Sequence, residues 1–143
     1  MPMKLRSLLI LTSILSLASL LPSAHAGADT PLEKQMQTLA RGTKRLSLQV
    51  GDPAKQQDTV TLIESLKQAV TESKPMEPRE TASVAPADRE KFLSDYRAQL
   101  DKLTAAYDQI EVAVKAGQYD QAKSLLTSIG PIKKEGHQKF KQD

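Results

Sequence analysis

Two side chains in this sequence, the thioether of Met36 and the imidazole of His137, could together hold a haem iron from its two axial sides. Sulfur and nitrogen donors of these types occur as axial ligands of haem iron in cytochromes. His137 is the only histidine that remains once an N-terminal export signal is removed, because His25 lies within that signal. The chain has no cysteine, which excludes a thiolate metal site and the Cys-x-x-Cys-His attachment of haem. Any haem would therefore be held without a covalent link.

The first 26 residues have the pattern of a secretory signal peptide. Two basic residues precede an uncharged stretch, residues 8–21, and the small-residue cleavage site Ala24-His25-Ala26 follows. The uncharged stretch has 14 residues, fewer than the roughly 20 that a helix needs to cross a bilayer. Cleavage would release residues 27–143, which we expect to form one soluble domain outside the cytoplasm.

The charge of the exported part gives little indication of a partner. Without the two basic residues of the signal, 18 basic residues stand against 17 acidic ones, so the formal net charge falls from +3 to +1. Charges of both signs are interspersed, and the chain contains only three tyrosines and two phenylalanines, so no basic stripe alternates with stacking side chains. We therefore expect no nucleic-acid partner and no membrane insertion. Nothing in the sequence supports an oligomer, so a monomer is expected.

Capping residues and apolar spacing predict the first two helices. Thr30, Pro31 and Glu33 supply a cap, a proline in the first turn and the acidic partner of a capping box. Apolar residues then recur at intervals of four and three, which is one face of a helix, and Thr43 fills the one gap in this pattern. Gly51-Asp52-Pro53 is predicted to end this helix and begin the second. Glycine favours a C-terminal cap, aspartate an N-terminal cap and proline the first turn of a helix.

Two further helices are predicted after a connector. Residues 73–87 contain three prolines and almost no bulky apolar residue, so they cannot be helical throughout. Asp88 begins the most regular helix, Gly117 ends it, and a tight turn leads into the fourth. Gly130-Pro131 predicts a kink inside the fourth helix, because an interior proline removes a backbone donor and clashes with the preceding turn. Such a kink could be harmless, or it could disturb a site at His137.

Four helices with two short turns and one longer link favour an all-α, antiparallel up-down-up-down four-helix bundle. This topology brings Met36, near the start of the first helix, and His137, near the end of the fourth, to the same end of the bundle. The connector and the start of the third helix reach that end as well. His137 lies 11 residues beyond Leu126 and 18 beyond Tyr119, close to three and five full turns, so an unbroken helix would point it into the core.

Each of the two donors also has an ordinary structural explanation. A methionine on an apolar helix face is most often a core side chain, and a histidine near a helix end is most often solvated or placed by the helix dipole. One alternative is accordingly a haem-free exported bundle that binds or scavenges a ligand and tolerates the Gly130-Pro131 kink without penalty. An enzyme has the least support, since there is no cysteine nucleophile, no Glu-x-x-His pair and no glycine-rich phosphate loop. We therefore expect no enzymatic activity.

At these positions the chain resembles the periplasmic cytochrome b562 family. Residues 30–39 (TPLEKQMQTL) are similar to the start of the family's first helix, where the methionine is one axial ligand. Residues 135–140 (EGHQKF) are similar to the end of its last helix, where the histidine is the other. Residues 116–122 (AGQYDQA) correspond to its tight turn between the third and fourth helices. The resemblance covers essentially all of the exported part, with a few extra residues before the third helix.

This resemblance implies a periplasmic single-electron carrier with one non-covalent haem b per chain, ligated by Met36 and His137, and with periplasmic redox proteins as partners. It also implies six neighbours of the haem: Leu32 and Leu39 beside the methionine, Tyr96 and Leu100 on the porphyrin, Pro75 in the connector over the haem edge, and Lys133 near a propionate. Tyr96 and Leu100 stand where the best-known members have phenylalanine, and Lys133 stands where an arginine is familiar. Two axial protein ligands would leave no open position on the iron, which favours electron transfer over catalysis.

Overall fold

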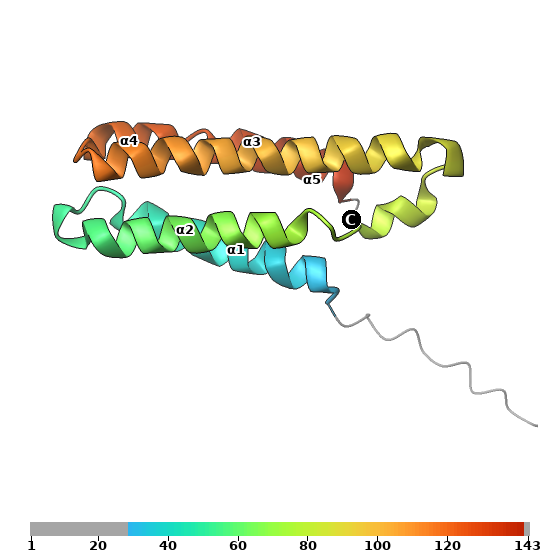
Figure 1. The fold of residues 1–143 in the computed structure, drawn as a ribbon, viewed down its shortest axis with the longest axis horizontal. Helices are drawn as coiled ribbons and strands as arrows, with labels where there is room; N and C mark the ends of the chain where they lie inside the picture. The colour runs from blue at the N-terminus through green and yellow to red at the C-terminus, as the bar shows by residue number, and fades with distance from the viewer. Residues whose placement is uncertain (1–28, 142–143) are drawn as a thin grey trace, which may run out of the picture.

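The computed structural model describes residues 29–141, so the predicted signal peptide, residues 1–26, lies outside the described part. The described chain is helical without any strand, and its main helices are α1 (Pro31–Gln49), α2 (Gln56–Ser73), α3 (Arg89–Lys115), α4 (Tyr119–Leu126) and α5 (Ile129–Phe140). α4 and α5 together take the place of the predicted fourth helix, and the all-α four-helix bundle is confirmed (Figure 1). None of the described helices is long and apolar enough to cross a membrane.

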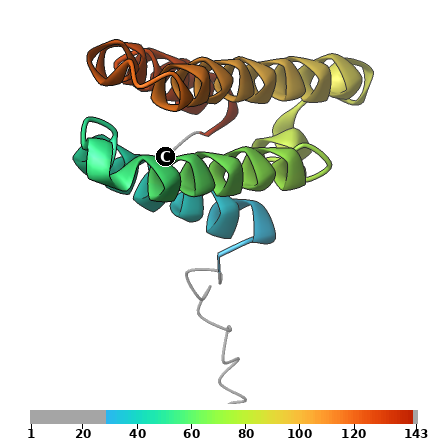
Figure 2. The same ribbon diagram turned by 60° about the vertical axis from the view of Figure 1, so that its left-hand side comes forward.

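The helices form two layers, with α1 and α2 in one and α3, α4 and α5 in the other (Figures 1 and 2). α1 packs along α2, α2 packs along α3, and both α4 and α5 pack on α3, whereas α1 and α5 are not among the pairs that pack extensively. The connector between α2 and α3 contains two short 3-10 helices, η2 (Arg79–Ser83) and η3 (Pro86–Asp88). As predicted, the start of α1, the connector and the end of α5 all lie toward one end of the bundle.

The cap and turn residues act as their types predict. Thr30 Oγ1 accepts a hydrogen bond from the Glu33 N–H at 3.2 Å, and Glu33 Oε2 accepts one from the Thr30 N–H at 2.6 Å, which completes the capping box. Gly117 adopts a φ of 70° directly after α3, and the N–H of Gln118 donates to the carbonyl of Ala113 at 2.8 Å. This is the left-handed helix ending that glycine permits. At the other turn the outcome differs: Asp52 caps the 3-10 helix η1 (Pro53–Lys55), accepting a hydrogen bond from the Ala54 N–H at 2.9 Å, and α2 begins at Gln56 rather than at Pro53.

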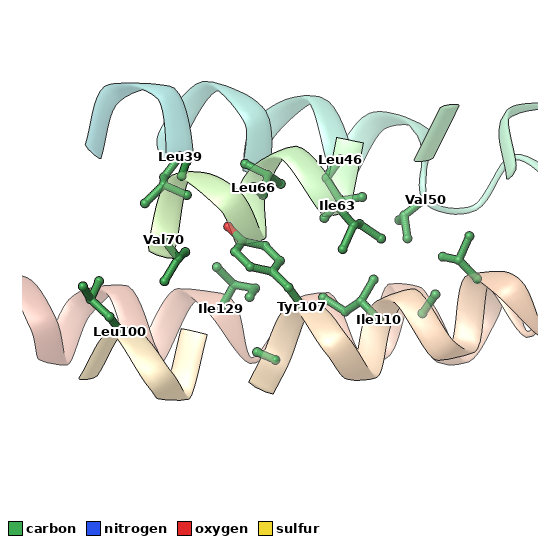
Figure 3. Close-up of a cluster of buried hydrophobic side chains, with 14 of the residues drawn as sticks. Leu39, Leu46, Val50, Ile63, Leu66, Val70, Leu100, Tyr107, Ile110 and Ile129 are labelled. Carbon is green, nitrogen blue, oxygen red and sulfur yellow. The ribbon is translucent and has the colours of Figure 1, made fainter. Parts of the chain in front are cut away.

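One apolar core runs along the bundle between the two layers (Figure 3). The fully buried Tyr107 of α3 lies in the middle of it, and burial raises the pKa of its phenol. The Tyr107 hydroxyl shares a hydrogen bond of 2.7 Å with Thr43 Oγ1 of α1. The polar residue that interrupts the apolar pattern of α1 therefore satisfies a buried hydroxyl, as a buried tyrosine requires.

The fourth helix is interrupted three residues before the predicted position. α4 ends at Leu126 and α5 begins at Ile129, with Thr127 and Ser128 between them. The hydroxyls of Thr127 and Ser128 donate to backbone carbonyls three residues earlier, at 2.6 and 2.7 Å. Pro131 is consequently the third residue of α5, where its missing N–H belongs to a first turn that has no intrahelical partners. The predicted kink inside a helix is thus a boundary between two helices, and the proline removes no hydrogen bond.

Candidate functional site

Met36 lies on the core face of α1, as its spacing predicts. Its side chain is half-buried and packs against the apolar core. Leu32 and Leu39, one turn before it and one turn after it, are 8% and 5% exposed. The thioether is therefore held in an apolar environment near the beginning of the bundle.

His137 does not point into the core. On α5 the buried side chains are Ile129 and Phe140, and the side chain of His137 is exposed. The expectation that a continuous helix turns this imidazole inward is wrong, because the reference residues Tyr119 and Leu126 are themselves only half-buried. His137 lies eight residues beyond the buried Ile129, about 80° round the helix from it. α5 instead takes its orientation from the residues that it packs against α3.

The end of α5 is anchored by an aromatic cluster that the sequence analysis missed. The ring of Phe140 meets the rings of Phe92 and Tyr96 on α3 edge to face, with centroid separations of 5.2 and 5.6 Å. Phe140 is only 8% exposed although it is the last residue of the helix. The available signal was a pair of aromatics four residues apart on one helix and a third aromatic at the end of another. This cluster fixes α5 within one turn of His137.

Tyr96 connects the same cluster to α2. Its hydroxyl donates a hydrogen bond to the carbonyl oxygen of Ser73, the last residue of α2, at 2.9 Å. Burial raises the pKa of Tyr96 to about 12, so the phenol stays protonated at any physiological pH. Tyr96 therefore joins α2, α3 and α5 at the end of the bundle where both donors lie.

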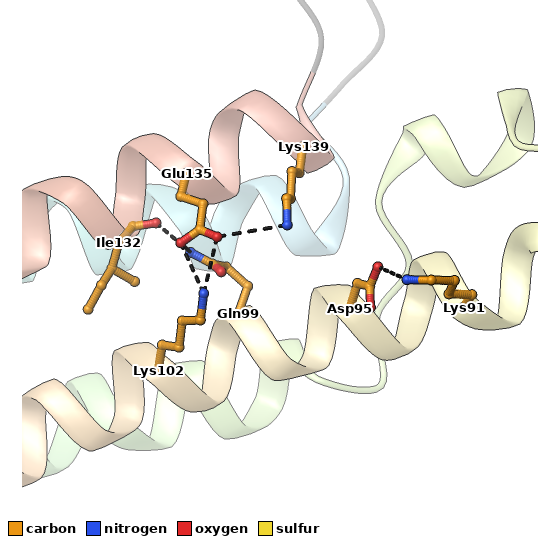
Figure 4. A network of polar contacts seen from close by, with 7 residues as sticks. All are labelled: Lys91, Asp95, Gln99, Lys102, Ile132, Glu135 and Lys139. Carbon is orange, nitrogen blue, oxygen red and sulfur yellow. Dashed lines mark hydrogen bonds and ion pairs between the residues drawn. The ribbon is translucent and has the colours of Figure 1, made fainter.

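A polar network holds the side of α5 against α3 (Figure 4). Gln99 Nε2 donates to the carbonyl of Ile132 at 2.8 Å and to Glu135 Oε2 at 3.3 Å. Lys102 Nζ lies 3.1 and 3.0 Å from the two carboxylate oxygens of Glu135, and Lys139 lies 3.8 Å from one of them. The hydrogen bond from Lys102, followed by that from Gln99, lowers the pKa of the Glu135 carboxyl. The network and the aromatic cluster thus position α5 from two directions.

The connector is tied to the start of α1. Arg79 of η2 donates through a guanidinium nitrogen to Glu33 Oε2 at 2.9 Å. The same carboxylate caps α1, and the hydrogen bond from the Thr30 backbone is the main cause of its lowered pKa. The Arg79 contact therefore places the connector one turn before Met36.

The six predicted neighbours divide into two groups. Leu32, Leu39, Tyr96 and Leu100 are buried and belong to the apolar core. Pro75, in the connector, and Lys133, one turn before His137, are exposed. Their roles around a haem remain predictions.

The types of donor at this end of the bundle fit a haem iron. The orientation of the His137 side chain, which is exposed, does not fit ligation. A thioether and an imidazole are suitable axial ligands, and the chain has no cysteine for a covalent attachment. Between residues 29 and 141, no group of three or more histidine, aspartate or glutamate side chains could hold a metal ion by itself. Ligation by His137 requires its imidazole to turn from the exposed side of α5 toward the interior.

A separate cleft of about 850 Å³ lies between the connector and the first turns of α3. Arg79, Thr81, Arg89 and Arg97 are among its lining residues, and neither Met36 nor His137 is. The cleft is therefore not the space between the two candidate ligands.

Comparison with known proteins identifies a family. The family model for cytochrome b562 matches residues 31–141, which span α1 to α5 and include both Met36 and His137. No curated protein and no solved structure matches the chain.

Proposed function

Because the chain belongs to the cytochrome b562 family, we propose that it is an exported single-electron carrier that holds one haem b between Met36 and His137. Family membership supports a haem-containing electron carrier. The observation that carries the finer proposal is that the matched region contains a thioether donor and an imidazole donor at the same end of one bundle. The absence of cysteine supports a non-covalent haem.

At the end of the bundle that carries Met36 and His137, some residues would bind the haem iron and others would exclude water from it. When bound, the haem iron supplies one-electron exchange between its ferric and ferrous states. Met36 would bind it through sulfur and His137 through nitrogen, and the thioether would favour the reduced state. Leu32 and Leu39 of α1, with Leu100 of α3, would keep the surroundings apolar and dry.

The packing of α5 serves this proposal because it restricts where His137 can be. Phe140 and Glu135 both fix α5 on α3, so the backbone of His137 stays at the end of the bundle that carries Met36. Only the side-chain torsions of His137 and small movements of α5 then remain to bring the imidazole to an axial position.

We also propose that the carrier works in the periplasm. The support is the signal-peptide pattern of residues 1–26, together with the periplasmic character of the family that the chain resembles. Its partners there would be other redox proteins, and the expected form is a monomer.

The exposure of His137 favours one competing function. In a haem-free binding or scavenging bundle, Met36 would be a core residue, and the Phe140 cluster would close the end of the core permanently. This alternative predicts that the protein neither contains haem nor binds it when it is added.

The visible spectrum of residues 27–143, exported with haem available and recorded before and after dithionite reduction, separates the two functions. Sharp α and β bands in the reduced form, with a weak sulfur-to-iron band in the oxidised form, are expected for a six-coordinate iron with Met and His ligands. A colourless protein that also fails to bind added haem would refute the proposal and leave the haem-free alternative.

A further inference from the structure

The net charge of +1 conceals a strong division of charge between the helices. α1, α5 and the following Lys141 contain eight basic residues and only two acidic ones, so the remainder of the exported chain carries a net negative charge. The eight basic residues are Lys34, Arg41, Lys44, Arg45, Lys133, Lys134, Lys139 and Lys141. All eight are exposed. Arg45 lines a hollow with Asp58 of α2, and Lys139 lies 3.8 Å from Glu135, which is paired with Lys102 of α3. We refer to the other six exposed side chains together as the α1–α5 face.

The two helices lie on the same side of the bundle, since α1 lies behind α2 and α5 behind α3 in Figure 1. The two acidic residues on them are already neutralised by bases from other elements. Glu33 is paired with Arg79 of the connector at 2.9 Å, and Glu135 is paired with Lys102 of α3 at 3.0 Å. The positive charge of this face is therefore not cancelled by its own carboxylates.

Most of the basic side chains on this face have no partner within residues 29–141. Lys34, Arg41, Lys44, Lys133 and Lys134 make no ion pair and no side-chain hydrogen bond with the described residues. Lysines elsewhere in the bundle are typically paired, as Lys67 is with Asp108 and Glu111, and Lys74 with Asp101. Charges that a fold leaves unpaired on one face attract an oppositely charged surface.

We propose that the α1–α5 face is a docking surface for an acidic redox protein. The inference rests on the proposed function, because both candidate iron ligands, Met36 and His137, lie on the two helices that form this face. An electron carrier needs rapid and reversible encounters, and complementary charge accelerates association without requiring tight binding. Lys133 and Lys134 of α5 and the following Lys141 lie one turn from His137 along the sequence, so a partner held by them would dock over the proposed electron path.

A protein partner is favoured over a nucleic acid or a membrane. The face offers no aromatic side chain for base stacking, since Phe140, the only aromatic residue on α1 or α5, is buried. The large apolar side chains exposed in the described part are Leu48 and Val112, and only Leu48 lies on α1 or α5. Insertion into a lipid surface needs a row of apolar side chains, which this face does not provide.

The test uses a plant-type [2Fe–2S] ferredoxin as the acidic probe. In stopped-flow mixing, one electron passes from the reduced cluster, which is oxidised, to the ferric protein, which is reduced. We expect the second-order rate constant to fall steeply as the salt concentration rises. At low ionic strength, the double variant Lys44→Glu, Lys134→Glu should react about tenfold more slowly than the parent, and at high ionic strength the two rates should converge.

A matched control variant distinguishes an effect of the α1–α5 face from an effect of the net charge of the protein. Lys55→Glu with Lys123→Glu changes the net charge by the same amount, and both residues lie outside α1 and α5, on η1 and α4, where they are paired with Asp52 and Asp120. This control should keep the parent rate within about twofold. Equal losses in both double variants, or no loss in either, would overturn the proposal.

A second measurement does not depend on haem. Binding of fluorescently labelled ferredoxin to the haem-free chain, followed by anisotropy at low salt, should be detectable for the parent and for the control and lost in the Lys44→Glu, Lys134→Glu variant. If the chain takes up no haem but shows this pattern, the electron-carrier function fails and the docking surface stands. Binding to phosphatidylglycerol vesicles with no binding to ferredoxin would assign the face to a membrane and refute the proposal.

Discussion

Replacing Phe140 with alanine should destabilise the haem-free bundle by about 3 kcal/mol. The Phe140 ring is 8% exposed and lies edge to face with Phe92 and Tyr96 at 5.2 and 5.6 Å. Burial of such a side chain contributes roughly 1.5–3 kcal/mol, and each aromatic pair adds about 0.5–1.5 kcal/mol. Core Phe→Ala changes cost about 3–5 kcal/mol, and the lower limit applies here because the last residue of a helix can relax into the space that is left.

Urea unfolding of residues 27–143, followed by far-ultraviolet circular dichroism, measures this loss directly. Phe140→Leu retains most of the buried apolar area and loses only the ring contacts, so it should cost about 1 kcal/mol. Lys139→Ala, at the exposed neighbouring position, should change the stability by less than about 0.5 kcal/mol. A loss for Phe140→Ala below about 1 kcal/mol, no larger than that of the lysine control, would show that the terminal ring is not part of the core.

Four other substitutions test the site and the fold. Met36→Ala should still bind haem through His137 but more weakly and with an altered spectrum, and His137→Ala should weaken binding further in a haem titration; unchanged spectra in both would exclude this ligand pair. The hydrogen bond from Lys115 is the main cause of the lowered pKa of Glu111. At a pH above its ordinary pKa of 4.5, the ionised carboxylate of Glu111 therefore stabilises the folded state. This stabilisation is lost as the pH falls through the lower pKa of the folded state. Glu111→Gln should therefore flatten the fall of the urea midpoint on acidification below about pH 5, and an unchanged slope would contradict the assigned pKa direction. Gly117→Ala should cost about 1 kcal/mol, because a Cβ meets no atom within 4 Å and only the φ of 70° is unfavourable, and an unchanged urea midpoint would contradict this conformation.

The ends of the helices could be predicted from the sequence because each depends on nearby residues. Thr30 and Glu33 are three residues apart, and their two hydrogen bonds form within a single turn. Gly117 ends α3 through its own backbone conformation and the next N–H. The position of Met36 on the core face could be predicted for a similar reason, since α1 is continuous from its cap and keeps one helical phase.

The orientation of His137 could not be predicted in the same way, because it depends on which side of the last helix is buried. Counting turns from Tyr119 or Leu126 takes them as core positions, whereas both are only half-buried and the buried residues are Ala122, Ile129 and Phe140. The buried side is set by packing against α3, where Phe140 meets side chains about 45 residues earlier in the sequence. Local patterns contain no information on such a contact. The ligand roles of Met36 and His137 themselves stay predictions.

The separation of α4 from α5 makes the last helix a unit that can open by itself. α5 has only 12 residues, too few for a stable isolated helix, so it remains folded through its contacts with α3. Breaking the contacts of Phe140 and Glu135 would release α5 while α1, α2 and α3 stay packed. Amide hydrogens of α5 should therefore exchange with solvent well before those of α3. Such local opening gives a large, flat cofactor a route into the end of the bundle that does not require the protein to unfold.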